Sequence, residues 1–128
     1  MRKAYAAIAT AVISVAAFWG ATGVATAANA TACVEIEGGR GCWYDYGDIF
    51  RVTDTKSDGY HPEVSWQTFG RNGTCKNYNG AGTTVACDYD LAEHQPLVFY
   101  VKIWDGNAQI RYSGPIHTCT SKPGGICS

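Results

Sequence analysis

The chain has 128 residues, of which 16% are charged, and its formal net charge is −1 at pH 7. It contains no cluster of lysine and arginine that would neutralise a phosphate backbone, so nucleic acid is not an expected partner. The length fits one small domain, and no apolar run beyond the N-terminal region is long enough to span a membrane.

The first 27 residues have the pattern of a secretory signal peptide. Residues 1–3 (MRK) supply a short positive region, residues 6–24 are almost entirely small and apolar, and residues 25–27 (ATA) match the small-x-small pattern that signal peptidase cuts. A membrane anchor fits less well, because the apolar stretch is rich in alanine and no charged stop follows it. We therefore expect a secreted single domain over residues 28–128. Without Arg2 and Lys3, eight basic residues remain against eleven acidic ones, a net charge of −3.

All six cysteines lie in this mature region, and an even number of cysteines in a small exported domain predicts three disulfides. Loops of this length each stabilise a fold by roughly 2.5–3 kcal/mol in the chain-entropy description. A zinc site is the weaker alternative, because no Cys-x-x-Cys pair is present. The short separations favour pairing along the chain, of Cys33 with Cys42, Cys75 with Cys87, and Cys119 with Cys127.

Alternation of apolar and polar residues with a period of two predicts half-buried β-strands. We expect six to eight short antiparallel strands packed as a small immunoglobulin-like β-sandwich, an all-β fold. The clearest alternating runs are residues 49–53, 63–68, 83–91 and 97–104.

Turn signals separate these runs. Residues 80–82 (GAG) predict a three-residue hairpin loop, which would set Cys75 opposite Cys87. Residues 105–107 (DGN) predict a second hairpin tip.

Residues 54–59 (DTKSDG) admit three interpretations: a calcium loop, a catalytic carboxylate pair or a turn. A calcium loop is disfavoured because Lys56 stands where an oxygen ligand is required and no glutamate follows at the right distance. The turn is favoured, since Asp58-Gly59 suits a left-handed backbone and Asp54 can accept main-chain N–H groups. We therefore expect no metal site, with a weak surface calcium site as the alternative.

Residues 41–48 (GCWYDYGD) crowd aromatic side chains beside carboxylates, which is typical of protein interfaces and of sugar-binding surfaces. The alternative is that one set of these side chains faces the core, because strand residues alternate between the two faces of a sheet. Thirteen aromatic residues remain after residues 1–27, more than a small sandwich usually hides, so some should be exposed. The candidate partner-binding residues are Trp43, Tyr44, Asp45, Tyr46, Tyr100 and Trp104.

Catalysis has little support in the sequence. The three histidines are scattered, and no nucleophile-elbow or zinc-protease motif is present. Asp45 with Asp48, or Asp88 with Asp90, would act as a glycosidase pair only beside a cleft. We expect no enzymatic activity and no cofactor.

The stretch GDIFRVTDTKSDGYHPEVSW, with NGAGT, FYVKIWDG and the flanking cysteines, resembles small secreted proteins of Streptomyces and related actinobacteria. The resemblance covers residues 47–112 and implies an exported, non-enzymatic, disulfide-stapled sandwich. In size, export and lack of catalytic residues the chain is also similar to the adaptor subunit of umbrella toxin particles. That adaptor joins a lectin-bearing protein to a large repeat-containing toxin chain. The similarity implies that an N-terminal segment enters the lectin partner, here Ala28, Asn29, Ala30, Thr31 and Ala32.

The leading hypothesis is therefore a secreted protein–protein binding module, an adaptor or subunit of an extracellular complex. A hydrolase inhibitor is one alternative, although residues 42–47 (CWYDYG) have aspartate where amylase inhibitors of the Trp-Arg-Tyr type have arginine. A carbohydrate-binding module is the other, with Trp43, Tyr44 and Asp45 as the sugar-contacting set.

Overall fold

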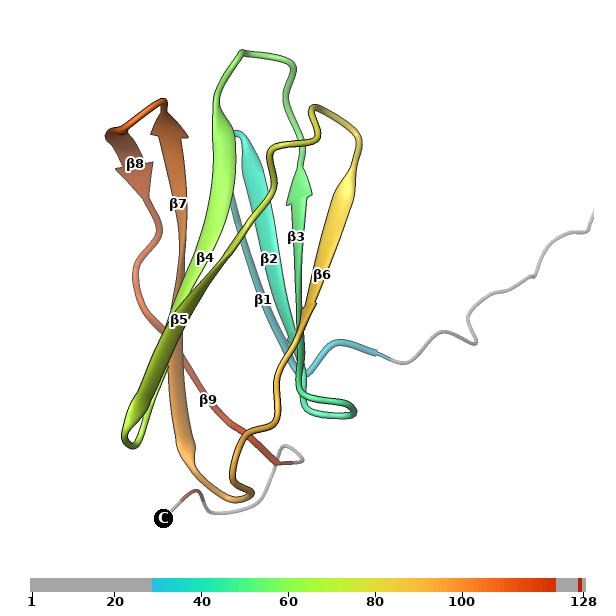
Figure 1. The fold of residues 1–128 in the computed structure, drawn as a ribbon, viewed down its shortest axis with the longest axis vertical. Helices are drawn as coiled ribbons and strands as arrows, with labels where there is room; N and C mark the ends of the chain where they lie inside the picture. Colours follow the sequence, from blue (N-terminus) through green and yellow to red (C-terminus); the bar gives the residue numbers. More distant parts are fainter. Residues whose placement is uncertain (1–28, 122–126, 128) are drawn as a thin grey trace, which may run out of the picture.

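The structure is a computed structural model that describes residues 29–121 and 127. The described residues are all-β and form two antiparallel sheets, so the predicted sandwich is confirmed (Figure 1). They hold nine strands, one more than the upper limit expected. The strands are β1 (Ala32–Ile36), β2 (Gly39–Tyr44), β3 (Ile49–Asp54), β4 (His61–Thr68), β5 (Arg71–Lys76), β6 (Thr84–Asp88), β7 (Pro96–Asp105), β8 (Ala108–Tyr112) and β9 (Ile116–Cys119).

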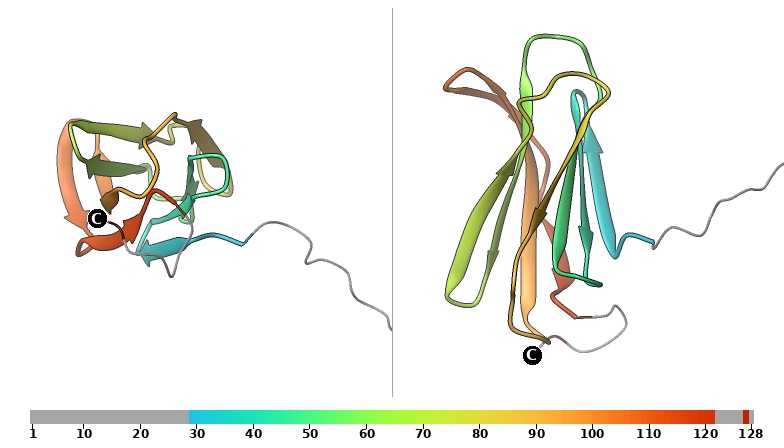
Figure 2. Two further views of the ribbon diagram at one scale, coloured as in Figure 1. Left: turned by 90° about the horizontal axis from the view of Figure 1, so that it is seen from below. Right: turned by 45° about the vertical axis from the view of Figure 1, so that its right-hand side comes forward.

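The first sheet has the order β1-β2-β3-β6, and the second has the order β5-β4-β7-β8. Strand β9 pairs with the N-terminal half of β7, while β8 pairs with the C-terminal half of β7. The chain crosses between the sheets after β3, β5 and β6, and Figure 2 shows the two layers from two further directions. Pairing of β3 with β6 and of β4 with β7 gives the Greek-key arrangement of immunoglobulin-like sandwiches.

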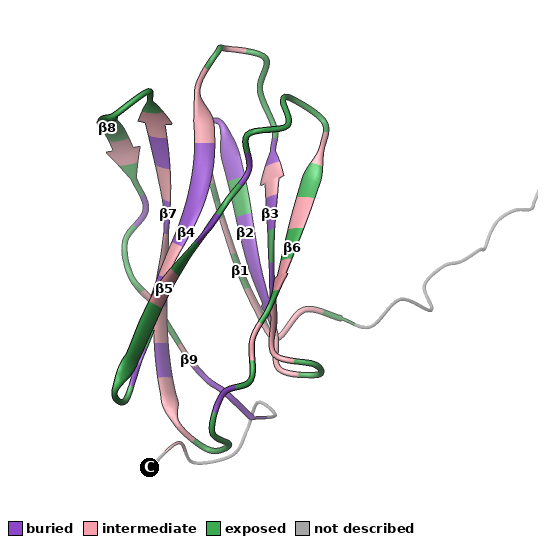
Figure 3. Ribbon diagram, viewed as in Figure 1, coloured by how far each residue is buried: buried purple, intermediate pink, exposed green. Residues whose placement is uncertain are grey.

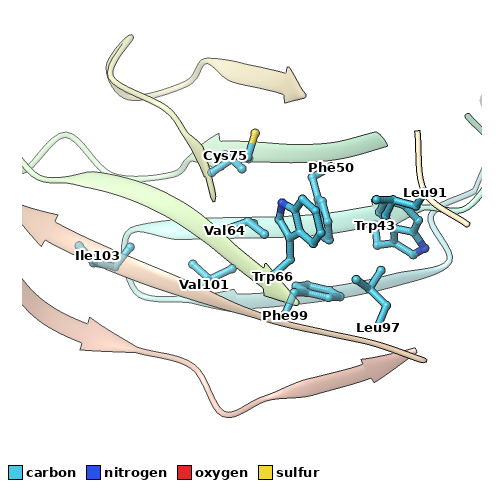
Figure 4. Packing of buried hydrophobic residues seen from close by; sticks show 11 residues of the cluster. Trp43, Phe50, Val64, Trp66, Cys75, Leu91, Leu97, Phe99, Val101 and Ile103 are labelled. Atoms are coloured by element: carbon cyan, nitrogen blue, oxygen red, sulfur yellow. The ribbon is translucent and has the colours of Figure 1, made fainter. Parts of the chain in front are cut away.

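The core lies between the sheets and follows the predicted alternation. Strand β7 alternates strictly between buried and half-buried residues from Pro96 to Trp104, and the inward residues of β3 and β4 are likewise buried (Figure 3). Four aromatic rings fill one end of the core: Phe50 lies 4.7 Å from Trp43 and 5.2 Å from Phe99 between ring centroids, and 6.2 Å from Trp66 (Figure 4). Such contacts add to the stabilisation from burial of the rings.

The sheets approach closely where β2 has glycine on its inner face. A Cβ atom at Gly41 would lie 2.5 Å from a Val64 methyl carbon and 2.7 Å from one of Val101. Gly39 is equally confined, with Pro62 2.6 Å from the place of a Cβ. The glycines of β2 therefore set the distance between the layers at this end of the core.

All three disulfides pair as the spacing predicted. The predicted hairpin around residues 80–82 is wrong, however. Strands β5 and β6 belong to different sheets, and Cys75–Cys87 joins one edge strand of each. The short separation identified the partners, but the chain between them crosses the sandwich instead of turning back along one sheet.

The predictions for the other two turns are confirmed. Residues 54–59 comprise the last residue of β3 and most of its connection to β4, where the main-chain N–H of Lys56 donates to Asp54 Oδ1 at 3.1 Å and Gly59 has a φ of 79°. At the second turn, Asp105 pairs with Ala108, which leaves Gly106 and Asn107 at the tip of the β7–β8 hairpin.

Candidate functional site

The N-terminal segment lies beside the turn between β2 and β3. The Thr31 hydroxyl donates to Asp45 Oδ1 at 2.6 Å and accepts the main-chain N–H of Asp45 at 2.9 Å. The main-chain N–H of Thr31 also donates to the carbonyl oxygen of Trp43 at 2.7 Å. Two groups of residues that the sequence nominated separately thus form one surface. We call residues 29–32 and 44–46 the N-terminal surface; Ala28 lies outside the described residues.

Tyrosine rings are the largest groups on this surface. Tyr46 has 82% of its area exposed, at the tip of the β2–β3 turn. Tyr44 is half-buried, and the Arg51 guanidinium lies 5.2 Å from its ring centroid. Arginine over an aromatic face is attracted by the ring quadrupole, which orders both side chains. Arg51 was not among the residues nominated from the sequence, although its pairing with Cys42 places it on the same face as Tyr44.

Asp48 anchors the other end of the β2–β3 turn. It has a positive φ of 56°, and its Oδ2 accepts the main-chain N–H of Leu91 at 3.0 Å. Burial raises the pKa of Asp48, the Leu91 N–H opposes that shift, and nearby carboxylates reinforce it. The Asp48 carboxylate is therefore used to hold the β2–β3 turn against the main chain at Leu91. Asp45 is equally committed to Thr31, so this carboxylate pair is engaged in holding the turn.

Trp43 does not belong to the surface, which corrects the sequence-based assignment. It is fully buried, its ring packs against Phe50, and its indole Nε1–H donates to the Cys119 carbonyl oxygen at 3.0 Å. The alternation of β2 turns Trp43 inward and Tyr44 outward. A partner or a sugar therefore has no access to Trp43 in the folded protein, which leaves Tyr44 and Asp45 of that set at the surface.

Tyr100 and Trp104 lie on the outer face of the other sheet, as their alternation with Phe99 and Val101 predicted. Both are half-buried, opposite Ser65 and His61 of β4. Glu63, only 3% exposed, lies between these positions, pairs across strands with Lys102 and has its carboxylate 3.9 Å from Lys76. This face therefore mixes charges with aromatic rings, and it is separated from the N-terminal surface by the thickness of the sandwich (Figure 1).

An apolar groove of about 540 Å³ lies where β4 ends and β7 and β9 pair. Its lining includes Phe69, Pro96, Leu97, Val98 and Thr118. Phe69 is 68% exposed, so this groove carries one of the most exposed large apolar side chains of the described residues.

A smaller and more polar cavity, about 310 Å³, lies at the opposite end of the sandwich between the β3–β4 and β5–β6 connections. Its residues come from two turns that are about twenty positions apart in the sequence. The sequence marked each of these turns, at residues 54–59 and 79–82, but gave no sign that the two lie side by side.

Comparisons with protein families, curated proteins and solved structures found no match. Among residues 29–121 and 127, no group of three or more His, Cys, Asp or Glu is placed to hold a metal ion. The same part of the chain contains no helix long and apolar enough to cross a membrane.

Proposed function

We propose that the protein is a secreted, non-enzymatic module that binds other proteins through the N-terminal surface. The observation that carries this proposal is the pair of hydrogen bonds between Thr31 and Asp45, which holds the N-terminal segment against the turn that exposes Tyr46. A fixed segment beside an exposed tyrosine is a suitable protein-binding surface, because tyrosine and arginine are enriched in interfaces.

The order of this surface favours binding. Association loses less entropy when the contacting groups are already held in place. Here the segment is fixed by Thr31, the turn by Asp48, and the Tyr44 ring by Arg51. A partner would therefore meet a surface whose shape is largely preformed.

Export is part of the proposal. Three disulfides in so small a domain are typical of extracellular proteins, where thiols oxidise. The module would act as an adaptor or subunit of an extracellular complex of the toxin type. Its partners would be other secreted proteins, a lectin-bearing subunit and a large repeat-containing toxin chain, as for the umbrella-particle adaptor to which the chain is similar in size and predicted export.

The test is co-purification from culture medium. The exported protein carries a C-terminal tag, and captured proteins are identified by mass spectrometry with their stoichiometry. Tyr46→Ala should reduce capture of a stoichiometric secreted partner at least about tenfold, as expected for an interface tyrosine worth more than 1.4 kcal/mol. Tyr112→Ala is the matched control. Tyr112 is also well exposed, at 64%, but it lies on β8 and outside the N-terminal surface.

Two outcomes would reject the proposal. One is that no stoichiometric protein is captured. The other is that a partner is captured equally well by the wild-type protein and by both variants of the N-terminal surface, Tyr46→Ala and Asp45→Ala. Capture of a single hydrolase whose activity is blocked would instead support the inhibitor alternative.

A further inference from the structure

The polar cavity between the β3–β4 and β5–β6 connections has ordered walls. Asn77 is fully buried, and its side-chain amide donates to the carbonyl oxygens of Val52 at 3.0 Å and Thr83 at 2.8 Å. Its side-chain oxygen accepts the main-chain N–H of Asn79 at 2.8 Å. The Gly82 N–H donates to the Asp54 carbonyl oxygen at 2.7 Å and so joins the two connections. The cavity is therefore held by hydrogen bonds within the protein that do not depend on a ligand.

One wall of the cavity presents an aromatic ring. Tyr78 is 66% exposed, and its ring lies 4.2 Å from the His61 ring with an interplanar angle of 38°. His61 thus supports one side of Tyr78 and leaves the remainder accessible. Burial lowers the pKa of His61, with a further contribution from Lys76, which favours the neutral imidazole as the support.

Two aspartates line the same space. Asp54 is only 2% exposed and lines the cavity. Its Oδ1 accepts the Lys56 N–H, while no hydrogen bond from the described residues reaches its other oxygen. Asp58 lines the cavity as well, and one of its oxygens accepts the Tyr60 N–H at 3.0 Å. A carboxylate that lines a cavity and has an oxygen without a donor favours a ligand that brings O–H groups.

The charge of the lining restricts the ligand further. Lys56 supplies positive charge, but its ammonium forms an ion pair with Glu37. The carboxylates would therefore repel an anionic ligand. A metal ion fits less well than a hydroxyl-bearing molecule, because no group of three ligating side chains forms here among the described residues.

We propose that this cavity binds one neutral hexopyranose unit of a glycan, with Tyr78 against an apolar face of the sugar and Asp54 and Asp58 accepting its hydroxyl groups. An exposed ring and convergent polar acceptors are the combination that a sugar requires, since it has both C–H faces and O–H edges. The cavity volume, about 310 Å³, suits a single sugar unit. The site goes beyond the proposed protein-binding function and lies at the other end of the sandwich from the N-terminal surface (Figure 1).

The experiment is a titration of the ¹⁵N-labelled, disulfide-bonded protein followed by amide chemical shifts. The probes are the methyl glycosides of glucose, galactose and mannose, and N-acetylglucosamine, each added into the millimolar range. At least one probe should cause saturable shifts confined to residues 54–61 and 77–83. Tyr78→Ala should weaken that binding at least about tenfold, whereas Tyr112→Ala, at a tyrosine of matched exposure, should leave it unchanged.

Asp54→Asn separates recognition from folding. The amide keeps an oxygen for the Lys56 N–H, so an unchanged amide spectrum would show that the fold persists. In that folded variant we expect weaker sugar binding. The proposal would be overturned if none of the four probes gave saturable shifts, if the shifts lay elsewhere, or if Tyr78→Ala and Tyr112→Ala behaved alike. It would also be overturned if calcium chloride alone reproduced the shifts, which would assign the cavity to a cation. None of these outcomes bears on capture of a protein by the N-terminal surface.

Discussion

The indole of Trp43 donates its Nε1–H to the carbonyl oxygen of Cys119 at 3.0 Å, across 76 positions of the chain. The bond joins β2 of the first sheet to the end of β9, which pairs with the second sheet. It also satisfies the polar atom of a ring that is otherwise enclosed by the core. Trp43 is therefore a structural link between the sheets, and the aromatic residue next to it, Tyr44, faces the surface.

Replacing Trp43 should reduce stability without any partner present. We expect Trp43→Phe to lower the free energy of unfolding by roughly 1–3 kcal/mol through the lost hydrogen bond and the vacated volume, and Trp43→Ala by about 3–5 kcal/mol. Urea denaturation measures both. Tyr46→Ala is the control and should stay within about 0.5 kcal/mol of the wild type, because Tyr46 is exposed. Equal stability of Trp43→Ala and Tyr46→Ala would refute the structural role.

A methyl group at Gly41 should push the two sheets apart. Its Cβ would lie 2.5 Å from Val64 and 2.7 Å from Val101, so Gly41→Ala should cost about 1–3 kcal/mol of overpacking. Gly114→Ala is the matched control, because no atom lies within 4 Å of its Cβ position. Thermal or urea denaturation of the two variants compares them directly. The close approach would be disproved by a Gly41→Ala protein as stable as Gly114→Ala.

Removing the disulfide between Cys75 and Cys87 should loosen the edge at which the sheets are joined. For the double variant Cys75→Ser/Cys87→Ser we expect a loss of about 2–4 kcal/mol, since the bond restricts the unfolded chain and the buried Cys75 sulfur also leaves the core. Amide hydrogen exchange should rise most in β5 and β6. Unchanged exchange in these strands, with unchanged stability, would show that the bond is not needed to hold the edge.

His61 should make stability fall as the solution is acidified. Its pKa is lowered from the ordinary value of 6.5, chiefly by burial and then by Lys76, while Glu63 and Asp54 act in the opposite direction. Below about pH 6.5 the unfolded chain therefore takes up a proton that the folded protein does not yet bind, so the free energy of unfolding decreases until the pH reaches the folded pKa.

The measurement is the free energy of unfolding as a function of pH, for the wild type and His61→Gln. The variant should show a shallower decrease just below pH 6.5, because glutamine does not titrate. Identical pH profiles of the two proteins would contradict the lowered pKa.

The strands and the disulfide partners were predictable because both depend on short-range patterns. Alternation identified the inward residues of β3, β4, β6 and β7, and small separations identified the cysteine pairs. Turn chemistry was also local, as the Asp54 and Gly59 geometry shows. The prediction from local patterns was wrong at residues 77–83. The Gly-rich sequence there is typical of a hairpin, but in the structure it connects two strands of different sheets.

The candidate sites depended on long-range contacts and were only partly predictable. Composition marked residues 43–46 as unusual, but the inward direction of Trp43 depends on which face of β2 meets the second sheet. The contact of Thr31 with Asp45 requires the β1–β2 hairpin, and the contact of Tyr78 with His61 requires that β5 lie beside β4. Both pairings are hairpins, but the contacting residues flank the hairpins and are 14 positions apart for Thr31 and Asp45, beyond a pattern of alternating residues.

The most direct measurement of the proposed function is hydrogen–deuterium exchange of the protein with and without its co-purified partner. We expect slower exchange on binding at residues 29–32 and 44–46, since a partner that covers the N-terminal surface would shield these main-chain amides. Exchange around the polar cavity, at residues 55–60 and 78–82, should not change unless a sugar is added. Protection confined to the outer face of β4 and β7, with none at residues 29–32 and 44–46, would contradict the assignment of the N-terminal surface as the binding site.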